Sequence, residues 1–197
     1  MEKLIRLIII CCISLSFQTI AADKDGKFAV KGAGKQTCAS FTEAITNKTT
    51  NYYLFGGWVE GFVSSYNRFQ PENFDITPWQ TTELILALLQ THCASNPEVK
   101  FLSATNALIK TLFPIRLSEN SNFVKIQVGK SQTYYYQEII NRAKKRLKVL
   151  GFIKGDISSA FSQEDAIAVE NYQKAIGHIA TGVLDQKTLA SLFLKAK

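Results

Sequence analysis

Cys38 and Cys93 constrain the fold of this 197-residue chain more than any other feature. The other two cysteines lie within residues 1–22, and the chain has only two histidines, His92 and His178. In an oxidising compartment, an isolated even pair of cysteines is typical of a disulfide rather than of a metal site. The bond would close the loop over residues 38–93 and stabilise the fold by up to about 4 kcal/mol. We therefore predict a Cys38–Cys93 disulfide, with no metal site and no cofactor.

The compartment follows from residues 1–22. Lys3 and Arg6 precede an apolar run that ends near Phe17, and small residues follow up to Ala22. This order is typical of a cleavable secretory signal peptide. The alternative is a membrane anchor, but the run is shorter than the roughly 20 residues that a span needs. We expect a periplasmic or secreted protein with no stable membrane insertion.

The formal net charge of +7 permits an anionic partner. A basic protein can associate with nucleic acid, with anionic lipid or with an anionic wall polymer. Export makes nucleic acid the weakest of the three, so we expect no nucleic-acid partner.

Residues 36–116 predict a small all-helical domain, preceded by a flexible lead-in at 23–35. A first helix can begin at Ser40, because Ser40 and Glu43 have the spacing of a capping box. A polar patch at 47–51 is expected to break or kink this helix before apolar residues resume at helical spacing.

Two further helices complete this predicted domain. Thr77 can cap the next helix, with Pro78 at its first position and its end near Ser95. Pro97 then begins another helix, which Pro114 stops. The disulfide would tie the first of the domain's helices to the one that ends near Ser95.

The rest of the chain predicts a linker and then three short helices. Residues 117–133 form the linker, with at most a short strand at Phe123–Val128. Tyr134–Leu150 has one apolar face, and its charges at Arg142–Lys148 are expected to be solvated. Gly151 fits the stop position after this helix.

The second and third of these helices have clear start signals. Ser162 with Asp165 begins the second, which Gly177 closes, and Asp185 can cap the third. Residues 134–197 are thus expected to be a three-helix bundle, and the fold class of the whole chain is all-α.

Four pieces of the last region, in order, resemble the widespread peptidoglycan-binding domain. They are Leu147–Gly155 (LKVLGFIKG), Phe161, Tyr172-Gln173 and Thr181–Leu192 (TGVLDQKTLASL). The resemblance covers residues 134–194 and implies peptidoglycan binding in a shallow groove near the loops. The candidate ligand-binding residues are Tyr172, Gln173, His178, Thr181 and Asp185. The family usually has Asp-Gly before the loop aromatic and a glycine after it, and this chain has Ser158, Ser159 and Ser162 instead, so we expect this loop to differ in shape.

Most of these residues also have a structural interpretation. Asp185 is expected to cap its helix and Tyr172 to pack, while Thr181 belongs to a turn. Gln173 can either brace a loop or face the ligand. His178 follows the second helix and is expected at the surface.

The first helical region carries a second, less specific resemblance. Trp58–Asn67, Asp75–Trp79 and Cys93–Pro97 are similar to helical periplasmic domains that include immunity-type inhibitors of peptidoglycan amidases. This resemblance implies a periplasmic protein partner such as a wall hydrolase.

The sequence contains no recognisable catalytic constellation, so we predict that the protein is not an enzyme. The two histidines are far apart, and Glu60, Asp75 and Glu83 form no evident catalytic pair. The leading hypothesis is a noncatalytic cell-envelope protein that binds peptidoglycan through its C-terminal domain and presents a helical interaction domain. The alternative is a periplasmic inhibitor or immunity protein of a cell-wall hydrolase.

Overall fold

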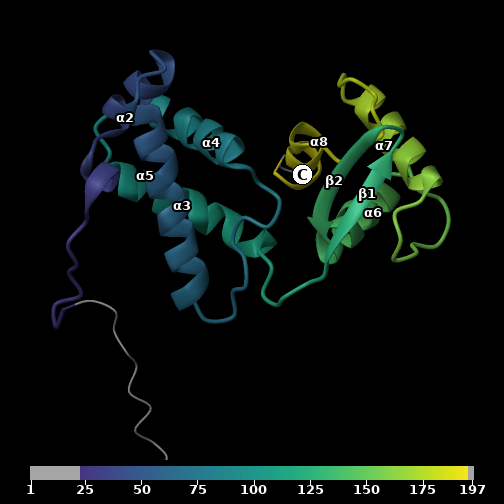
Figure 1. Cartoon of the computed structure of the whole chain (residues 1–197), viewed down its shortest axis with the longest axis horizontal. Helices are drawn as coiled ribbons and strands as arrows, with labels where there is room; N and C mark the ends of the chain where they lie inside the picture. The colour runs from purple at the N-terminus through teal and green to yellow at the C-terminus, as the bar shows by residue number, and fades with distance from the viewer. Residues whose placement is uncertain (1–22, 195–197) are drawn as a thin grey trace, which may run out of the picture. The chain divides into compact units, whose positions relative to one another are not determined.

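The computed structural model describes residues 23–194 of the chain (Figure 1). The predicted signal peptide, residues 1–22, lies outside the described residues. From Gly32 onward the chain forms one compact unit, and the residues before it belong to another. In the described part of that earlier unit, Asp23 Oδ1 accepts hydrogen bonds from the backbone N–H groups of Asp25 and Lys27, which closes a turn.

The first half of the later unit consists of helices. In chain order they are the 3-10 helix η1 (Gly32–Lys35), α2 (Cys38–Thr46), α3 (Asn51–Phe69), α4 (Thr82–Ala94), α5 (Phe101–Leu112) and the 3-10 helix η2 (Phe113–Ile115). The polar patch at 47–51 separates α2 from α3, as its composition predicted. Gly34 lets η1 approach α3, because a Cβ there would lie 2.2 Å from Trp58 Cζ2.

Three of the predicted helix starts were wrong. Thr37 caps α2, since its hydroxyl accepts a hydrogen bond from the Ser40 backbone N–H. Thr81 caps α4 in the same way, whereas the backbone N–H of Thr77 donates to Asp75 Oδ1 outside the helix. The last helix of this group, α5, begins only at Phe101. A side-chain oxygen can cap a helix or close a local turn, and the surrounding fold decides which.

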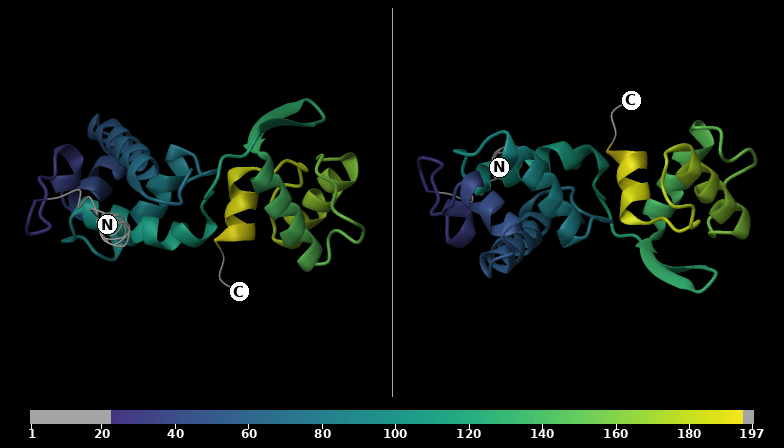
Figure 2. Two further views of the ribbon diagram at one scale, coloured as in Figure 1. Left: turned by 90° about the horizontal axis from the view of Figure 1, so that it is seen from below. Right: turned by 90° about the horizontal axis from the view of Figure 1, so that it is seen from above.

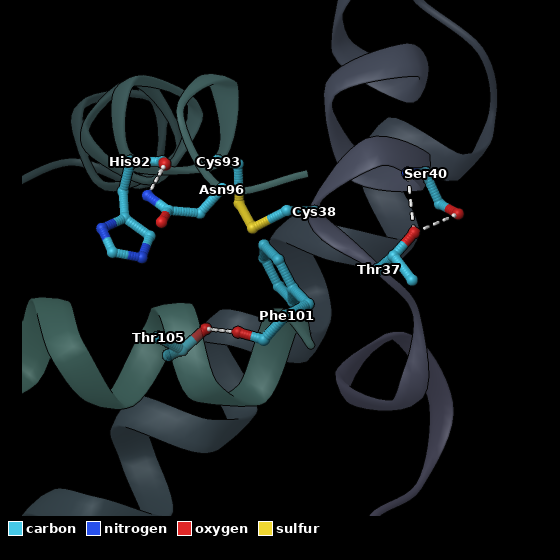
Figure 3. Close-up of a disulfide and its surroundings, with 8 residues drawn as sticks. All are labelled: Thr37, Cys38, Ser40, His92, Cys93, Asn96, Phe101 and Thr105. Atoms are coloured by element: carbon cyan, nitrogen blue, oxygen red, sulfur yellow. Dashed lines mark hydrogen bonds between the residues drawn. A yellow bond between two sulfur atoms is a disulfide. The ribbon is translucent and has the colours of Figure 1, made fainter. Parts of the chain in front are cut away.

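The predicted disulfide is present and joins α2 to α4 (Figure 3). Cys38 and Cys93 are both buried, and the Phe101 ring points toward the bond. Phe41, Phe55 and Phe101 pack around one another with ring centroids 4.6 to 5.0 Å apart. The centre of this helical cluster is therefore built from aromatic side chains, and the disulfide lies on one side of them.

A two-stranded antiparallel hairpin follows, and part of it corrects the sequence prediction. The expected strand forms as β1 (Phe123–Val128), and it pairs with β2 (Ser131–Tyr136). Residues 134–136 are therefore strand rather than the start of a helix. The spacing of their apolar side chains also fits a helix, but in the fold their backbone groups pair with those of residues 123–125 in the sheet. The chain is nevertheless mostly helical, as the all-α prediction requires.

Three helices complete the chain: α6 (Gln137–Val149), α7 (Gln163–Ala175) and α8 (Gln186–Phe193). The start signals of the last two are confirmed. Ser162 and Asp165 form a reciprocal capping box on α7, and Asp185 Oδ1 accepts from the Thr188 N–H at 2.7 Å. Ile139, Leu147, Val169, Leu189 and Leu192 form the core of these helices, together with Ile126 and Tyr135 from the hairpin.

The second core also receives residues from the first half of the chain. Trp79 and Leu117 are part of it, and the Trp79 ring lies 5.7 Å from that of Phe193. The Gln186 side chain donates to the backbone oxygen of Trp79 and accepts from the Thr81 N–H at 3.0 Å. These contacts attach α8 to the loop that precedes α4.

Candidate functional site

Gln173 lies at the centre of the region that the sequence singled out. Its side chain is 0% exposed. Oε1 accepts hydrogen bonds from the backbone N–H groups of Thr181 at 2.8 Å and Gly182 at 3.0 Å. Nε2 lies 2.9 Å from both Val183 O and Thr188 Oγ1. Gln173 therefore braces the loop between α7 and α8, which was one of the two roles considered for it.

The other four candidate residues lie near this loop, with different exposures. Tyr172 is buried, and its hydroxyl lies 2.9 Å from Ser191 Oγ. Asp185 is half-buried and caps α8, and His178 is half-buried with no hydrogen-bond partner at Nδ1. Thr181 is exposed and contributes its hydroxyl to the turn. The structure thus brings all five residues together, with most of their polar atoms used inside the fold.

Lys144 was predicted to be solvated, and the structure contradicts that expectation. Only 1% of the residue is exposed. Nζ lies 2.6 Å from Asp165 Oδ2, and it donates hydrogen bonds to Ser158 O at 2.9 Å and Ala160 O at 2.7 Å. A buried ammonium group needs such partners, because burial removes its hydration. Lys144 therefore fixes the serine-containing loop that connects α6 to α7.

This loop forms one side of a groove of about 370 Å³. The groove lies between the segment after α6 and the first turns of α7. Phe152, Ile153 and Ala168 provide apolar surface, while Lys154, Asp156 and Glu164 provide charges of both signs. The sequence interpretation treated the Leu147–Gly155 motif only as a marker of the fold, although its last four residues line the groove.

The groove offers several hydrogen-bonding groups to a ligand. Lys154, Asp156 and Glu164 are exposed, and Ser162 is half-buried. The pKa of the Glu164 carboxyl is lowered from its ordinary value, chiefly by a hydrogen bond from Ser162. Asp165 faces inward instead, and its charge is balanced by Lys144. The arrangement suits an uncharged or mixed-charge polar ligand with some apolar surface.

A second hollow, of about 570 Å³, lies in the first helical cluster between η1, α2 and α3. Phe55, Trp58 and Leu54 form its apolar part, and Glu43 is its one ionisable residue. Within residues 23–194, no group of three or more His, Cys, Asp or Glu side chains is placed to hold a metal ion. None of the described helices is long and apolar enough to cross a membrane.

Comparison with known proteins supports the resemblance found in the C-terminal region. Residues 137–192 match the family model of the putative peptidoglycan binding domain. The matched segment contains α6, α7, all but the last residue of α8, the braced loop and the groove. No curated protein and no solved structure matches the chain. The match supports peptidoglycan as a partner, whereas the likeness of the first helical region to immunity-type proteins stays a prediction.

Proposed function

We propose that the chain is an exported, noncatalytic cell-envelope protein that binds peptidoglycan through residues 137–192 and presents the helices of residues 36–116 to a second partner. One observation carries the proposal: the segment that matches a peptidoglycan-binding family contains a preformed groove with polar and apolar walls. The matched family, which is described as a binding domain, supports the binding role; the absence of catalysis is part of the proposal.

The groove suits the mixed chemistry of peptidoglycan. Its glycan offers hydroxyl and acetamido groups, and its stem peptides offer amides, carboxylates and amines. Lys154 can donate to a carboxylate or carbonyl oxygen, and Asp156 and Glu164 can accept from amine or hydroxyl groups. Phe152 and Ile153 supply apolar contact, and Phe152 is supported by Tyr172 at a centroid distance of 5.4 Å. Binding would occur without a large rearrangement, because Lys144 already fixes one side of the groove.

The proposed second partner would use the first helical cluster. The hollow between η1, α2 and α3 is within the size range of ligand pockets in proteins. Its aromatic side is rigid, because the Trp58 ring stacks on Phe62 at 5.2 Å and lies against Gly34. A side chain or loop of a protein partner with apolar surface and a positive charge complements the aromatic rings and Glu43.

Sedimentation with purified peptidoglycan sacculi tests the proposed function. The purified protein should sediment with the sacculi. Lys154→Glu should weaken retention by about tenfold, the equivalent of one charge-assisted hydrogen bond. Lys110→Glu is the matched control, because Lys110 is also an exposed lysine but lies on α5, away from the groove.

The three outcomes that would contradict the proposal are distinct. Wild-type protein that stays in the supernatant would remove peptidoglycan binding altogether. Equal retention of Lys154→Glu and Lys110→Glu would leave peptidoglycan binding in place but remove the groove as its site. Release of soluble muropeptides from the sacculi would show that the protein is an enzyme.

A further inference from the structure

The hairpin exposes two aromatic rings on its outer face, Phe123 and Tyr134. Directly paired residues lie on the same face of the sheet, so Phe123 and Tyr136 lie together, as do Lys125 and Tyr134. Phe123 is 62% exposed and Tyr134 is 52% exposed. Phe74, which precedes the hairpin in the chain, is 38% exposed and packs against Tyr136 at 5.8 Å. We call Phe74, Phe123, Tyr134 and Tyr136 the aromatic platform.

The opposite face of the hairpin is already buried. Ile126 and Tyr135 are part of the second core, and the Tyr135 hydroxyl donates a hydrogen bond to Leu184 O. The hairpin therefore does not need the aromatic platform in order to attach to the protein. Figure 2 shows β1 and β2 standing out from the helices that follow them. This leaves the outer face open among the described residues.

The aromatic platform has a regular geometry. The rings of Phe123 and Tyr134 are nearly parallel, with 16° between their planes and 6.0 Å between their centroids. Phe123 also contacts Tyr136 at 5.2 Å. Cross-strand aromatic pairs stabilise a hairpin, but this effect does not account for rings that leave more than half of their surface to water. Exposed aromatic clusters of this kind are typical of binding surfaces.

The polar residues around the rings indicate the ligand's charge. The outer face also holds Lys125, Gln127 and Gln132, and it has no carboxylate among its strand residues. The nearby carboxylate is that of Asp75. Burial, the larger cause, and the negative charge of Asp75 both raise the pKa of Tyr136. Asp75 Oδ1 already accepts hydrogen bonds from Asn67 Nδ2 at 3.2 Å and the Thr77 N–H at 2.9 Å. The face is thus complementary to a neutral or anionic ligand.

The aromatic platform is continuous with the segment that matches the peptidoglycan-binding family. β2 ends at Tyr136, and the match begins at Gln137. Gln137 Nε2 donates to Ser159 O at 2.6 Å, in the loop that also borders the groove. The hairpin is therefore attached to the same helices that would hold a polymer bound by residues 137–192.

From these observations we infer that the aromatic platform binds the glycan strand of peptidoglycan. Pyranose rings present C–H groups with partial positive charge, and the faces of aromatic rings carry partial negative charge. Gln127 and Gln132 can hydrogen-bond to acetamido and hydroxyl groups, and Lys125 can pair with a carboxylate attached to the glycan. This inference rests on the proposed function, but it assigns a second contact outside the matched segment and its groove.

A soluble tetramer of β-1,4-linked N-acetylglucosamine is the direct probe, because it has the sugar faces but no stem peptide. The double variant Phe123→Thr/Tyr134→Thr removes both rings and keeps residues that favour strands. The wild type should bind the tetramer saturably in a chemical-shift titration, and the double variant should bind at least about tenfold more weakly. Phe69→Ala and Tyr53→Ala form the matched control, because both residues are exposed on α3, and they should leave the affinity unchanged.

The same variants in sacculus sedimentation separate this inference from the proposed function. Loss of retention in the double variant, with an unchanged circular dichroism spectrum and melting temperature, is the expected result. If the wild type binds sacculi but not the tetramer, or if the double variant equals the wild type in both assays, the aromatic platform does not bind glycan and the proposed function stands. If the wild type binds the tetramer but not sacculi, the proposed function fails instead. Loss of an envelope-protein partner with unchanged glycan binding would identify a protein-docking face and overturn the inference.

Discussion

Lys144 Nζ and Asp165 Oδ2 lie 2.6 Å apart in an ion pair whose side chains expose only 1% and 9% of their surface. The other role of Asp165 is to complete the capping box of α7, where Oδ2 accepts from the Ser162 N–H at 2.8 Å. One carboxylate therefore caps the start of α7, holds the end of the preceding loop and pairs with the ammonium group of a lysine on α6. The shape of the groove depends on this pair.

Replacing Lys144 with Met should destabilise the protein strongly. The substitution keeps most of the side-chain volume but leaves Asp165, Ser158 O and Ala160 O without their cation. Loss of one member of a buried pair costs about 3–5 kcal/mol, measurable as a shift of the urea unfolding midpoint. Lys145→Met is the control, because Lys145 is the exposed neighbour on the same helix. Similar midpoints for the two variants would contradict the structural role of Lys144.

Gln173→Met should loosen the loop between α7 and α8. Methionine has a similar length and volume, but it cannot accept from Thr181 N and Gly182 N or donate to Val183 O. Each buried group left unpaired costs about 1–3 kcal/mol, so the total loss should reach about 3 kcal/mol or more. Amide hydrogen exchange should rise first at residues 181–183. Lys174→Met, at the exposed next position, should change neither quantity, and unaltered exchange in Gln173→Met would contradict the bracing role.

Tyr135 should make the stability of the protein depend on pH in the alkaline range. Burial is the main cause that raises the pKa of its phenol above the ordinary value of 10.0. A raised pKa in the folded state means that the stabilisation is complete below the unfolded pKa and is lost as pH rises through the folded pKa. Below that window, Tyr135→Phe should be less stable than the wild type by about 1 kcal/mol, because it lacks the hydrogen bond to Leu184 O.

The difference between wild type and Tyr135→Phe should then shrink as the pH rises above about 10. Urea unfolding of both proteins over this range measures the difference directly. Contributions from the other titrating groups are common to both proteins and cancel. A difference that stays constant across the range would show that the Tyr135 phenol is not buried as described.

Capping residues predicted two of the helix starts in the C-terminal region, and the isolated pair of cysteines predicted the disulfide. Ser162 with Asp165 and Asp185 with Thr188 act as their spacing indicated, because these bonds are local in sequence. Thr77 does not cap a helix, because its backbone N–H and hydroxyl both bond to Asp75 Oδ1 in a local turn that the capping pattern does not reveal. Tyr134 and Tyr136 were assigned to a helix because a short run fits both periods until its partner strand is known.

The groove was harder to predict than the helices. Lys144 stands among Arg142, Lys145 and Arg146, and this run of charges suggested a solvated face. The spacing of Lys144 indicated burial instead, because it lies four residues after Ile140 and three before Leu147, and both of these residues are buried. The loop that Lys144 holds cannot be placed from spacing alone, because its shape depends on backbone oxygens at residues 158 and 160 rather than on side-chain identity.

The bond between Cys38 and Cys93 also limits how far the protein can be stretched. A molecule held by the wall at one end and by a partner at the other carries tension along its backbone. The bond spans 55 positions, so at about 3.5 Å per extended residue it withholds roughly 190 Å of chain from elongation. All of α3 lies inside this closed loop. When the pull is applied before Cys38 and after Cys93, the reach of the tether grows only through the residues outside positions 38–93, even if the helices of the first cluster are pulled apart.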